Sequence, residues 1–191
     1  MNIDVRFSEL SGLEKDAVFT ADAVISNLST DTRMLKTGDT YLAIKGEHFD
    51  GHDFIENAVA SGAASLVVSS PVNAEIPSIR VRDTVLSLGN IAKLYRNRLT
   101  AKVVGITGSN GKTTVKEMVT SICRERGQVT ATLANNNNRI GVPLTLLSAS
   151  LKDEFVVVEM GTSEQGEIAY LSDIVEPDIS VVTTISESHL S

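Results

Sequence analysis

The sequence is poor in cysteine and in positive charge. Cys123 is the single cysteine in 191 residues, which excludes a disulfide framework and a cysteine-rich zinc site. Lysine and arginine number 17 against 24 acidic residues, so a basic nucleic-acid-binding surface is not expected. No apolar run approaches the roughly 18 residues of a membrane helix, and the start, MNIDVRFSEL, lacks the order of a signal peptide. These absences predict a cytoplasmic protein without a membrane span or a nucleic-acid partner.

The first part of the chain, residues 1–100, predicts a small α/β domain. Residues 41–44 and 65–68 have the composition of strands, and apolar residues recur at helical spacing between them. A further helix is predicted over 84–99, with one apolar stripe. We therefore expect a domain boundary near Thr100.

The second part, residues 101–191, has a regular pattern. Four apolar runs alternate with helical stretches: 103–106, 129–132, 155–158 and 179–182. This alternation predicts right-handed βαβ crossovers and a doubly wound parallel sheet, that is, a Rossmann-like fold. The helix over 112–126 is expected to bury Val115, Met118, Val119, Ile122 and Cys123, which makes Cys123 a packing residue.

A glycine-rich turn, GITGSNGKTT, joins the first of these runs to its helix. Backbone N–H groups of such a turn, together with the helix N-terminus, form a cradle for anions. The strict phosphate-loop pattern fails because Ile106 stands at its first glycine, but the shorter form T-G-x-x-G-K-T fits. We expect Lys112 to reach the outer phosphates of a nucleotide and the Thr113 hydroxyl to contact Mg²⁺.

Further polar residues follow the other predicted strands. Glu159 emerges from a valine-rich run, and a carboxylate at the carboxyl end of such a strand is a natural Mg²⁺ ligand. His189 follows the fourth run, and from the pattern alone a metal or phosphate role competes with that of an ordinary loop histidine. For Asn135–Asn138, ligand binding and simple turn formation are equally open.

Several motifs resemble the Mur ligase family, in order and with matching spacing. They are STDTR, GDTYLAIKGEHFDGHDFIENAVASGA, TGSNGKTTVKEM, NNNNRIGVPLTLL, VVVEMGTSEQGEI and a downstream Ser-His-Leu. The resemblance runs from about Ser29 to Leu190. It is greatest to the branch that joins D-alanyl-D-alanine to UDP-N-acetylmuramoyl-tripeptide.

The resemblance implies an ATP- and Mg²⁺-dependent ligase of cytoplasmic peptidoglycan precursor synthesis, monomeric at full length, that works through an acyl phosphate. Residues 1–100 would be its UDP-sugar-binding domain, and residues 101–191 the first part of its ATP-binding central domain. Lys112, Glu159 and His189 would be catalytic, with Thr113, Glu159 and His189 holding Mg²⁺. ATP would be bound by Gly108, Ser109, Asn110, Gly111, Lys112, Thr113, Thr114 and Asn138. The UDP-linked substrate would be bound by Thr32, Glu47, His48, Phe49, Asn135 and Asn137.

The sequence also departs from the family. Ala134 replaces a usual glycine, and Thr184 stands where asparagine is common. The family continues to a carbamylated lysine and a third domain, so we expect this chain to be the first two-fifths of a ligase and inactive by itself. Two alternatives are a ligase of the branch that adds the third amino acid, and a nucleotide-binding module without ligase activity. The third residue of the peptide, diaminopimelate or lysine, stays open.

Overall fold

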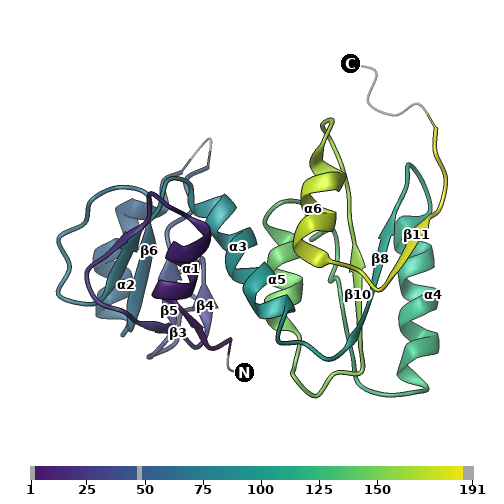
Figure 1. Cartoon of the computed structure of the whole chain (residues 1–191), viewed down its shortest axis with the longest axis horizontal. Coiled ribbons are helices and arrows are strands. Elements are labelled where there is room, and N and C mark those ends of the chain that lie inside the picture. Colours follow the sequence, from purple (N-terminus) through teal and green to yellow (C-terminus); the bar gives the residue numbers. More distant parts are fainter. Residues whose placement is uncertain (1–2, 47–48, 187–191) are drawn as a thin grey trace. The chain divides into compact units, whose positions relative to one another are not determined.

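The computed structural model describes residues 3–46 and 49–186 (Figure 1). The chain divides into two compact units, Met1–Leu94 and Tyr95–Ser191. This division lies inside helix α3 (Thr84–Arg96), a short way before the predicted boundary near Thr100. None of the helices in the described ranges is long and apolar enough to cross a membrane.

The first unit is built on a five-stranded sheet in the order β2-β7-β6-β5-β4. The strands β4 to β7 run parallel, β2 is antiparallel to β7, and β1 and β3 form a separate antiparallel pair. The elements are β1 (Val5–Arg6), α1 (Phe7–Leu13), β2 (Val18–Phe19), β3 (Val24–Ile25), β4 (Leu28–Ser29), β5 (Thr40–Leu42), the 3₁₀ turn η1 (Gly51–Phe54), α2 (Ile55–Ala60), β6 (Ser65–Val68) and β7 (Ser78–Arg80).

The predicted strands and helix of this unit are present as β5, α2 and β6. Ile55 and Ala58 of α2 pack on Tyr41, Leu66 and Val68 of the sheet, because the apolar positions of the helix recur on one face. The sequence pattern did not indicate β1, α1, β2, β3, β4 or β7. Strands of two residues are too short to show an alternating pattern.

The second unit contains a four-stranded parallel sheet in the order β11-β8-β10-β9, and the predicted α/β fold with parallel sheets is confirmed. The four predicted strands and the helix that follows the glycine-rich turn are all observed. The elements are β8 (Lys102–Thr107), α4 (Lys112–Arg124), β9 (Val129–Ala131), α5 (Gly141–Ser148), β10 (Phe155–Glu159), α6 (Glu167–Val175) and β11 (Ile179–Val182).

Helices cover both faces of this sheet. Helix α4 contacts β8, β9 and β10 on one face, and α5 and α6 pack together on the other (Figure 1). The chain leaves β8 toward β9 on one side and leaves β10 toward β11 on the other. The carboxyl ends of β8 and β10 are therefore the topological switch point, where ligands bind in folds of this kind.

The predicted buried face of α4 is partly wrong. Met118 and Ile122 are 61% and 68% exposed, whereas Lys116 and Thr120 are 2% and 1% exposed. Helical spacing fits either face, and the rotation of the helix is fixed by what the sheet offers it. Cys123 is half-buried, and burial raises the pKa of its thiol, in agreement with a packing role.

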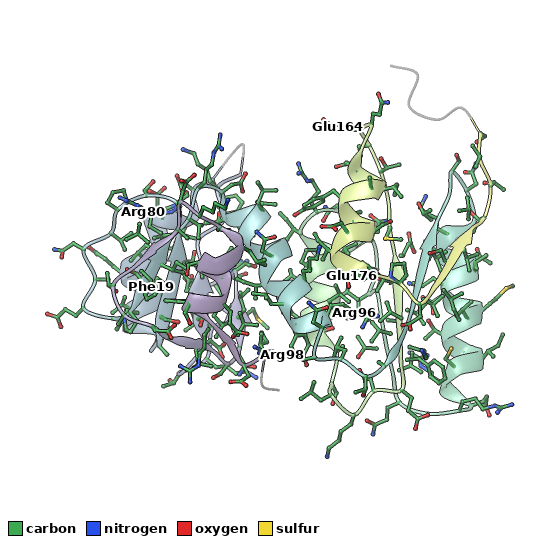
Figure 2. The ribbon with its side chains drawn as sticks, in the orientation of Figure 1. Phe19, Arg80, Arg96, Arg98, Glu164 and Glu176 are labelled. Carbon is green, nitrogen blue, oxygen red and sulfur yellow. The ribbon has the colours of Figure 1, made fainter. Side chains whose placement is uncertain are left out.

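Asp178 ties together the edge of the second unit that lies opposite the switch point. Its carboxylate accepts hydrogen bonds from the Val103 N–H at 2.9 Å, the Lys102 ammonium at 2.9 Å and the Arg96 guanidinium at 3.2 Å. Arg96 also donates to the carbonyls of Val175 and Glu176. Figure 2 shows Arg96 beside Glu176. The Val103 and Lys102 hydrogen bonds hold the pKa of Asp178 below its usual range.

Replacing Asp178 by Asn should lower the free energy of unfolding by about 1–2 kcal/mol at pH 7, because charge-assisted hydrogen bonds are lost. The folded-state pKa is depressed, so this stability is present above the unfolded pKa and disappears as the pH falls through the folded one. Urea unfolding at pH 7 and below about pH 4 measures it. A difference between variant and parent that grows on acidification would contradict the charge-assisted role.

Ala134 has a φ of 49°, in the left-handed region that favours glycine, which accounts for the glycine usual at this position in the Mur ligase family. Ala134→Gly should therefore raise the unfolding free energy by up to about 1 kcal/mol, since the strain on Cβ disappears. Urea unfolding of the variant measures the change. Ala149→Gly is the control. Ala149 has a φ of −65°, where alanine is unstrained, so this variant should have a lower free energy of unfolding than the parent.

Candidate functional site

The glycine-rich turn lies between β8 and α4 at the switch point. Gly108 and Gly111 have φ values of 136° and 81°, which only glycine adopts readily. A Cβ on Gly108 would stand 2.2 Å from the Thr183 hydroxyl oxygen, so the turn is also too close to the segment after β11 for a larger residue. The local sequence thus fixes the tight turn from strand to helix.

The segment after β11 forms hydrogen bonds to backbone groups of this turn. The N–H of Ser109 donates to the Thr184 carbonyl at 2.8 Å, and the N–H of Asn110 donates to the Thr184 hydroxyl at 3.1 Å. The Thr183 hydroxyl donates to the Asn110 carbonyl at 2.6 Å. Threonine at 184 therefore supplies a polar side-chain atom to the turn.

The amino end of α4 is prepared for an anion. Its N-cap is Gly111, which has no side chain to satisfy the first N–H groups of the helix. The Lys112 ammonium lies over the turn and donates to the Gly108 carbonyl at 2.7 Å. A pocket of about 320 Å³ opens here, and it is lined by Thr107, Gly108, Ser109, Lys112, Thr162, Ile168, Val182, Thr184 and Ile185. Thr113 and Thr114 are exposed in the first turn of the helix.

Glu159, the last residue of β10, is 2% exposed. Its carboxylate accepts hydrogen bonds from the Thr113 hydroxyl at 3.0 Å and from the Asn137 side-chain amide at 2.9 Å. Its backbone N–H donates to the Thr132 hydroxyl at 2.9 Å. The structure thus brings Glu159, Thr113 and Asn137 together, as the carboxyl ends of neighbouring parallel strands predict.

No lysine or arginine of the described residues forms an ion pair with the Glu159 carboxylate. A buried charge without a partner is costly, and such groups are normally paired or bound to a metal. Within residues 3–46 and 49–186 there is no cluster of three or more metal-ligating side chains. One carboxylate and a hydroxyl beside a phosphate site fit Mg²⁺, which commonly takes its other ligands from phosphates and water.

The asparagine run serves several purposes. Asn137 reaches Glu159, and its carbonyl accepts the Gly161 N–H at 2.8 Å. A Cβ on Gly161 would stand 2.9 Å from the Asn137 side chain, so glycine is needed for this close approach. The Asn138 side-chain oxygen accepts the N–H groups of Ile140 at 3.1 Å and Gly141 at 2.9 Å, immediately before and at the start of α5. Asn135 is exposed.

A second pocket, of about 510 Å³, lies entirely in the first unit. It is lined by Thr30, Asp31, Thr32, Arg33, Tyr41, Phe49 and Phe54. Thr32 and Phe49 are among the predicted substrate-binding residues. Tyr41 and Phe54 are not, because the sequence pattern places them in the core-facing positions of a strand and a helix. Glu47 and His48, like His189 in the other unit, lie outside the described residues.

Arg33 and Asp31 form a fixed pair at this second pocket. The Arg33 guanidinium donates to both Asp31 carboxylate oxygens, at distances from 2.6 to 3.1 Å. Together with the Arg33 backbone N–H, it lowers the pKa of Asp31 to about 2. The carboxylate is therefore ionised at any working pH, and the pocket combines aromatic faces with a hydroxyl and a charged pair.

Ser69, His52 and Asp50 of the first unit have the composition of a catalytic triad. His52 Nδ1 lies 2.5 Å from Asp50, but His52 Nε2 accepts the backbone N–H of Ser69 at 2.9 Å. A triad needs that nitrogen to take the serine proton. The Ser69 hydroxyl lies 3.4 Å from the same nitrogen, so the shorter contact is the one to the backbone, and the three residues brace two loops.

The chain is similar to known proteins along its length. A model of the Mur ligase family catalytic domain matches residues 24–118, and a model of the Mur ligase middle domain matches residues 106–191. The UDP-N-acetylmuramoyl-tripeptide–D-alanyl-D-alanine ligase of Escherichia coli (strain K12) is 40% identical over 188 residues, which cover 98% of this chain and 42% of that protein.

Two solved structures are similar as well. MurF from Acinetobacter baumannii has a TM-score of 0.83 and 35% identity, over 94% of this chain and 41% of that one. MurF from Thermotoga maritima, in complex with ADP, has a TM-score of 0.80 and 34% identity, over 87% of this chain and 39% of that one. The chain thus spans about two-fifths of the length of these relatives. Since the two family models together cover residues 24–191, the chain belongs to the Mur ligase family and is MurF-like.

Proposed function

We propose that this chain carries the nucleotide-binding and UDP-sugar-binding parts of an ATP-dependent ligase. The ligase joins D-alanyl-D-alanine to UDP-N-acetylmuramoyl-tripeptide in peptidoglycan synthesis. The observation that carries the proposal is the buried Glu159 carboxylate, which lacks a cationic partner among the described residues and touches the first turn of a phosphate-loop helix. The names of the similar proteins supply the substrates.

In the proposed reaction the terminal phosphoryl group of ATP passes to a carboxylate of the UDP-linked peptide and gives an acyl phosphate. The amine of D-alanyl-D-alanine then attacks the activated carbonyl, and phosphate leaves. The chain has to provide positioning and electrostatic stabilisation rather than a nucleophile. The braced Ser69–His52–Asp50 group and the packed Cys123 agree with this requirement.

Each residue of the site has a part in this proposal. Lys112 and the first N–H groups of α4 bind the phosphates, and Lys112 stabilises charge on the transferred group. Glu159 and Thr113 would hold Mg²⁺, which would neutralise phosphate charge. Asn137 orients the Glu159 carboxylate through its amide. His189, which lies outside the described residues, is proposed as a further ligand on the resemblance alone.

In the first unit we propose that the pocket around Thr32 holds the uridine nucleotide of the substrate. Phe49, Phe54 and Tyr41 offer aromatic surface to a base, and Thr32 offers a hydroxyl. This second pocket favours a ligase over a nucleotide-binding module without ligase activity, because a module of that kind needs only the ATP site. The named relatives add D-alanyl-D-alanine, which favours that branch over the one that adds the third amino acid.

We further propose that the full ligase is cytoplasmic and monomeric. ATP and UDP-linked precursors are compounds of the cytoplasm, and the lone cysteine agrees with a reducing compartment.

Lys112→Ala should weaken ATP·Mg²⁺ binding by about 10- to 100-fold, because a charge-assisted contact to phosphate is lost. The fold should persist, since the ammonium bonds only to carbonyls of the turn. Calorimetric titration and a thermal melt measure the two effects. Lys152→Ala, the same charge change at an exposed loop before β10, is the matched control and should bind like the parent. Unchanged affinity in folded Lys112→Ala would reject the phosphate-loop assignment.

UDP should bind to the first unit independently of ATP. In an NMR titration it should shift amide signals of Thr30–Arg33, Phe49 and Phe54, and leave those of Gly108–Thr114 largely unchanged. Thr32→Val should reduce these shifts, because it removes the hydroxyl and keeps the shape. Shifts confined to the turn before α4 would mean that UDP merely occupies the ATP site, and the proposed uridine pocket would be wrong.

A further inference from the structure

Lys116 is a buried lysine that the proposed phosphate chemistry does not use. It lies one helical turn after Lys112 on α4 and is 2% exposed. Its ammonium donates to the Thr132 carbonyl at 2.9 Å and pairs with the Glu117 carboxylate at 2.7 Å. Burying an ammonium group is unfavourable, so we expect the Lys116–Thr132 hydrogen bond to have a role other than stabilising the fold.

This role concerns the ladder between β9 and β10. In register, Ala131 faces Val157, and the Thr132 N–H donates to the Val157 carbonyl at 3.0 Å. A regular parallel ladder would continue with the Glu159 N–H donating to the Thr132 carbonyl. Instead, the Glu159 N–H donates to the Thr132 hydroxyl at 2.9 Å, and the Thr132 carbonyl accepts from Lys116. Lys116 therefore donates to the carbonyl that would extend the sheet, in the place where a strand N–H would donate.

The segment that follows β9 separates from β10, and this separation allows Asn137 to lie beside Glu159. Once pairing with β9 has ended, the Gly161 N–H beyond Glu159 donates to the Asn137 carbonyl at 2.8 Å. The Asn137 amide donates to the Glu159 carboxylate at 2.9 Å. If β9 continued to pair, the loop after it would not return to Glu159 at this point.

We propose that Lys116 is a positioning residue. Its ammonium donates to the Thr132 carbonyl and so ends the β9–β10 ladder, which places the Asn137 and Glu159 side chains in the positions that magnesium binding requires. This inference rests on the proposed function for its consequence, but its structural part does not. A lysine suits the position because its long stem crosses the apolar helix–sheet interface and its tip carries only donors.

The test compares Lys116→Met with the parent protein. Methionine keeps the length and apolar stem and removes the donor. The Asn137 side-chain amide and the Glu159 backbone amide should shift in NMR spectra recorded without any ligand. In titrations with ATP, the Mg²⁺ concentration needed for half-maximal enhancement of binding should rise by about 10-fold, as when a residue that orients a metal ligand is lost. ATP affinity without Mg²⁺ should stay within about twofold, since the phosphate turn is untouched.

Thr120→Val is the matched control. Thr120 lies one turn further on the same buried face, its hydroxyl has no hydrogen-bond partner in the described part of the chain, and valine has the same shape. It should leave both the amide signals and the Mg²⁺ dependence unchanged. If Lys116→Met does not fold, Lys116→Gln is compared instead: its shorter stem withdraws the donor from the Thr132 carbonyl and should shift the same signals.

Two results would overturn the proposal. Either a folded Lys116→Met whose Asn137 and Glu159 signals match the parent, or equal loss of ATP affinity with and without Mg²⁺, would reduce Lys116 to a packing residue. Failure of the proposed function looks different, because the parent itself would then show no Mg²⁺-dependent ATP binding. The ligand-free NMR comparison would still decide the structural part.

Discussion

The second unit depends on one buried carboxylate, Glu159, which has no cationic partner among the residues that the structure describes. Glu159 ends β10 at the switch point of the sheet, where the chain leaves neighbouring strands in opposite directions. Two neutral donors, the Thr113 hydroxyl and the Asn137 amide, hold its oxygens. Neutral donors fix the direction of a carboxylate without cancelling its charge, so the charge stays available to a dication. The same helix end that supplies Thr113 carries Lys112 and first N–H groups that no cap side chain satisfies, and we propose that it binds phosphate.

The two pockets differ in the chemistry that they offer. The pocket beside the turn combines backbone donors and a lysine, which suits phosphate. The pocket of the first unit combines aromatic side chains with a hydroxyl and the Asp31–Arg33 pair, which suits a base and its sugar. The proposed reaction transfers a phosphoryl group to a carboxylate oxygen of the UDP-linked substrate, and an amine then attacks the carbonyl carbon and displaces phosphate. Both kinds of site serve that reaction, and it needs no nucleophile from the protein.

The two departures from the Mur ligase motifs, Ala134 and Thr184, both concern the path of the backbone. Ala134 occupies a left-handed conformation, so its Cβ introduces strain that glycine would avoid. Thr184 replaces an amide by a hydroxyl, and that hydroxyl still accepts the Asn110 N–H. In both cases the required backbone path is kept and only the side chain that serves it has changed.

The sequence by itself determined the parts whose residues are neighbours in the chain. The alternation of apolar runs and helices, the turn from Gly108 to Thr113, and Glu159 at the end of its strand all follow from local periodicity and turn chemistry. Only the tertiary structure decided which asparagine of four reaches Glu159, that Lys116 rather than Met118 faces the sheet, and that Tyr41 and Phe54 line a pocket with Thr32. These contacts join residues far apart in sequence. They depend on strand order, helix rotation and the point at which a ladder ends, and short sequence patterns leave each of these undetermined.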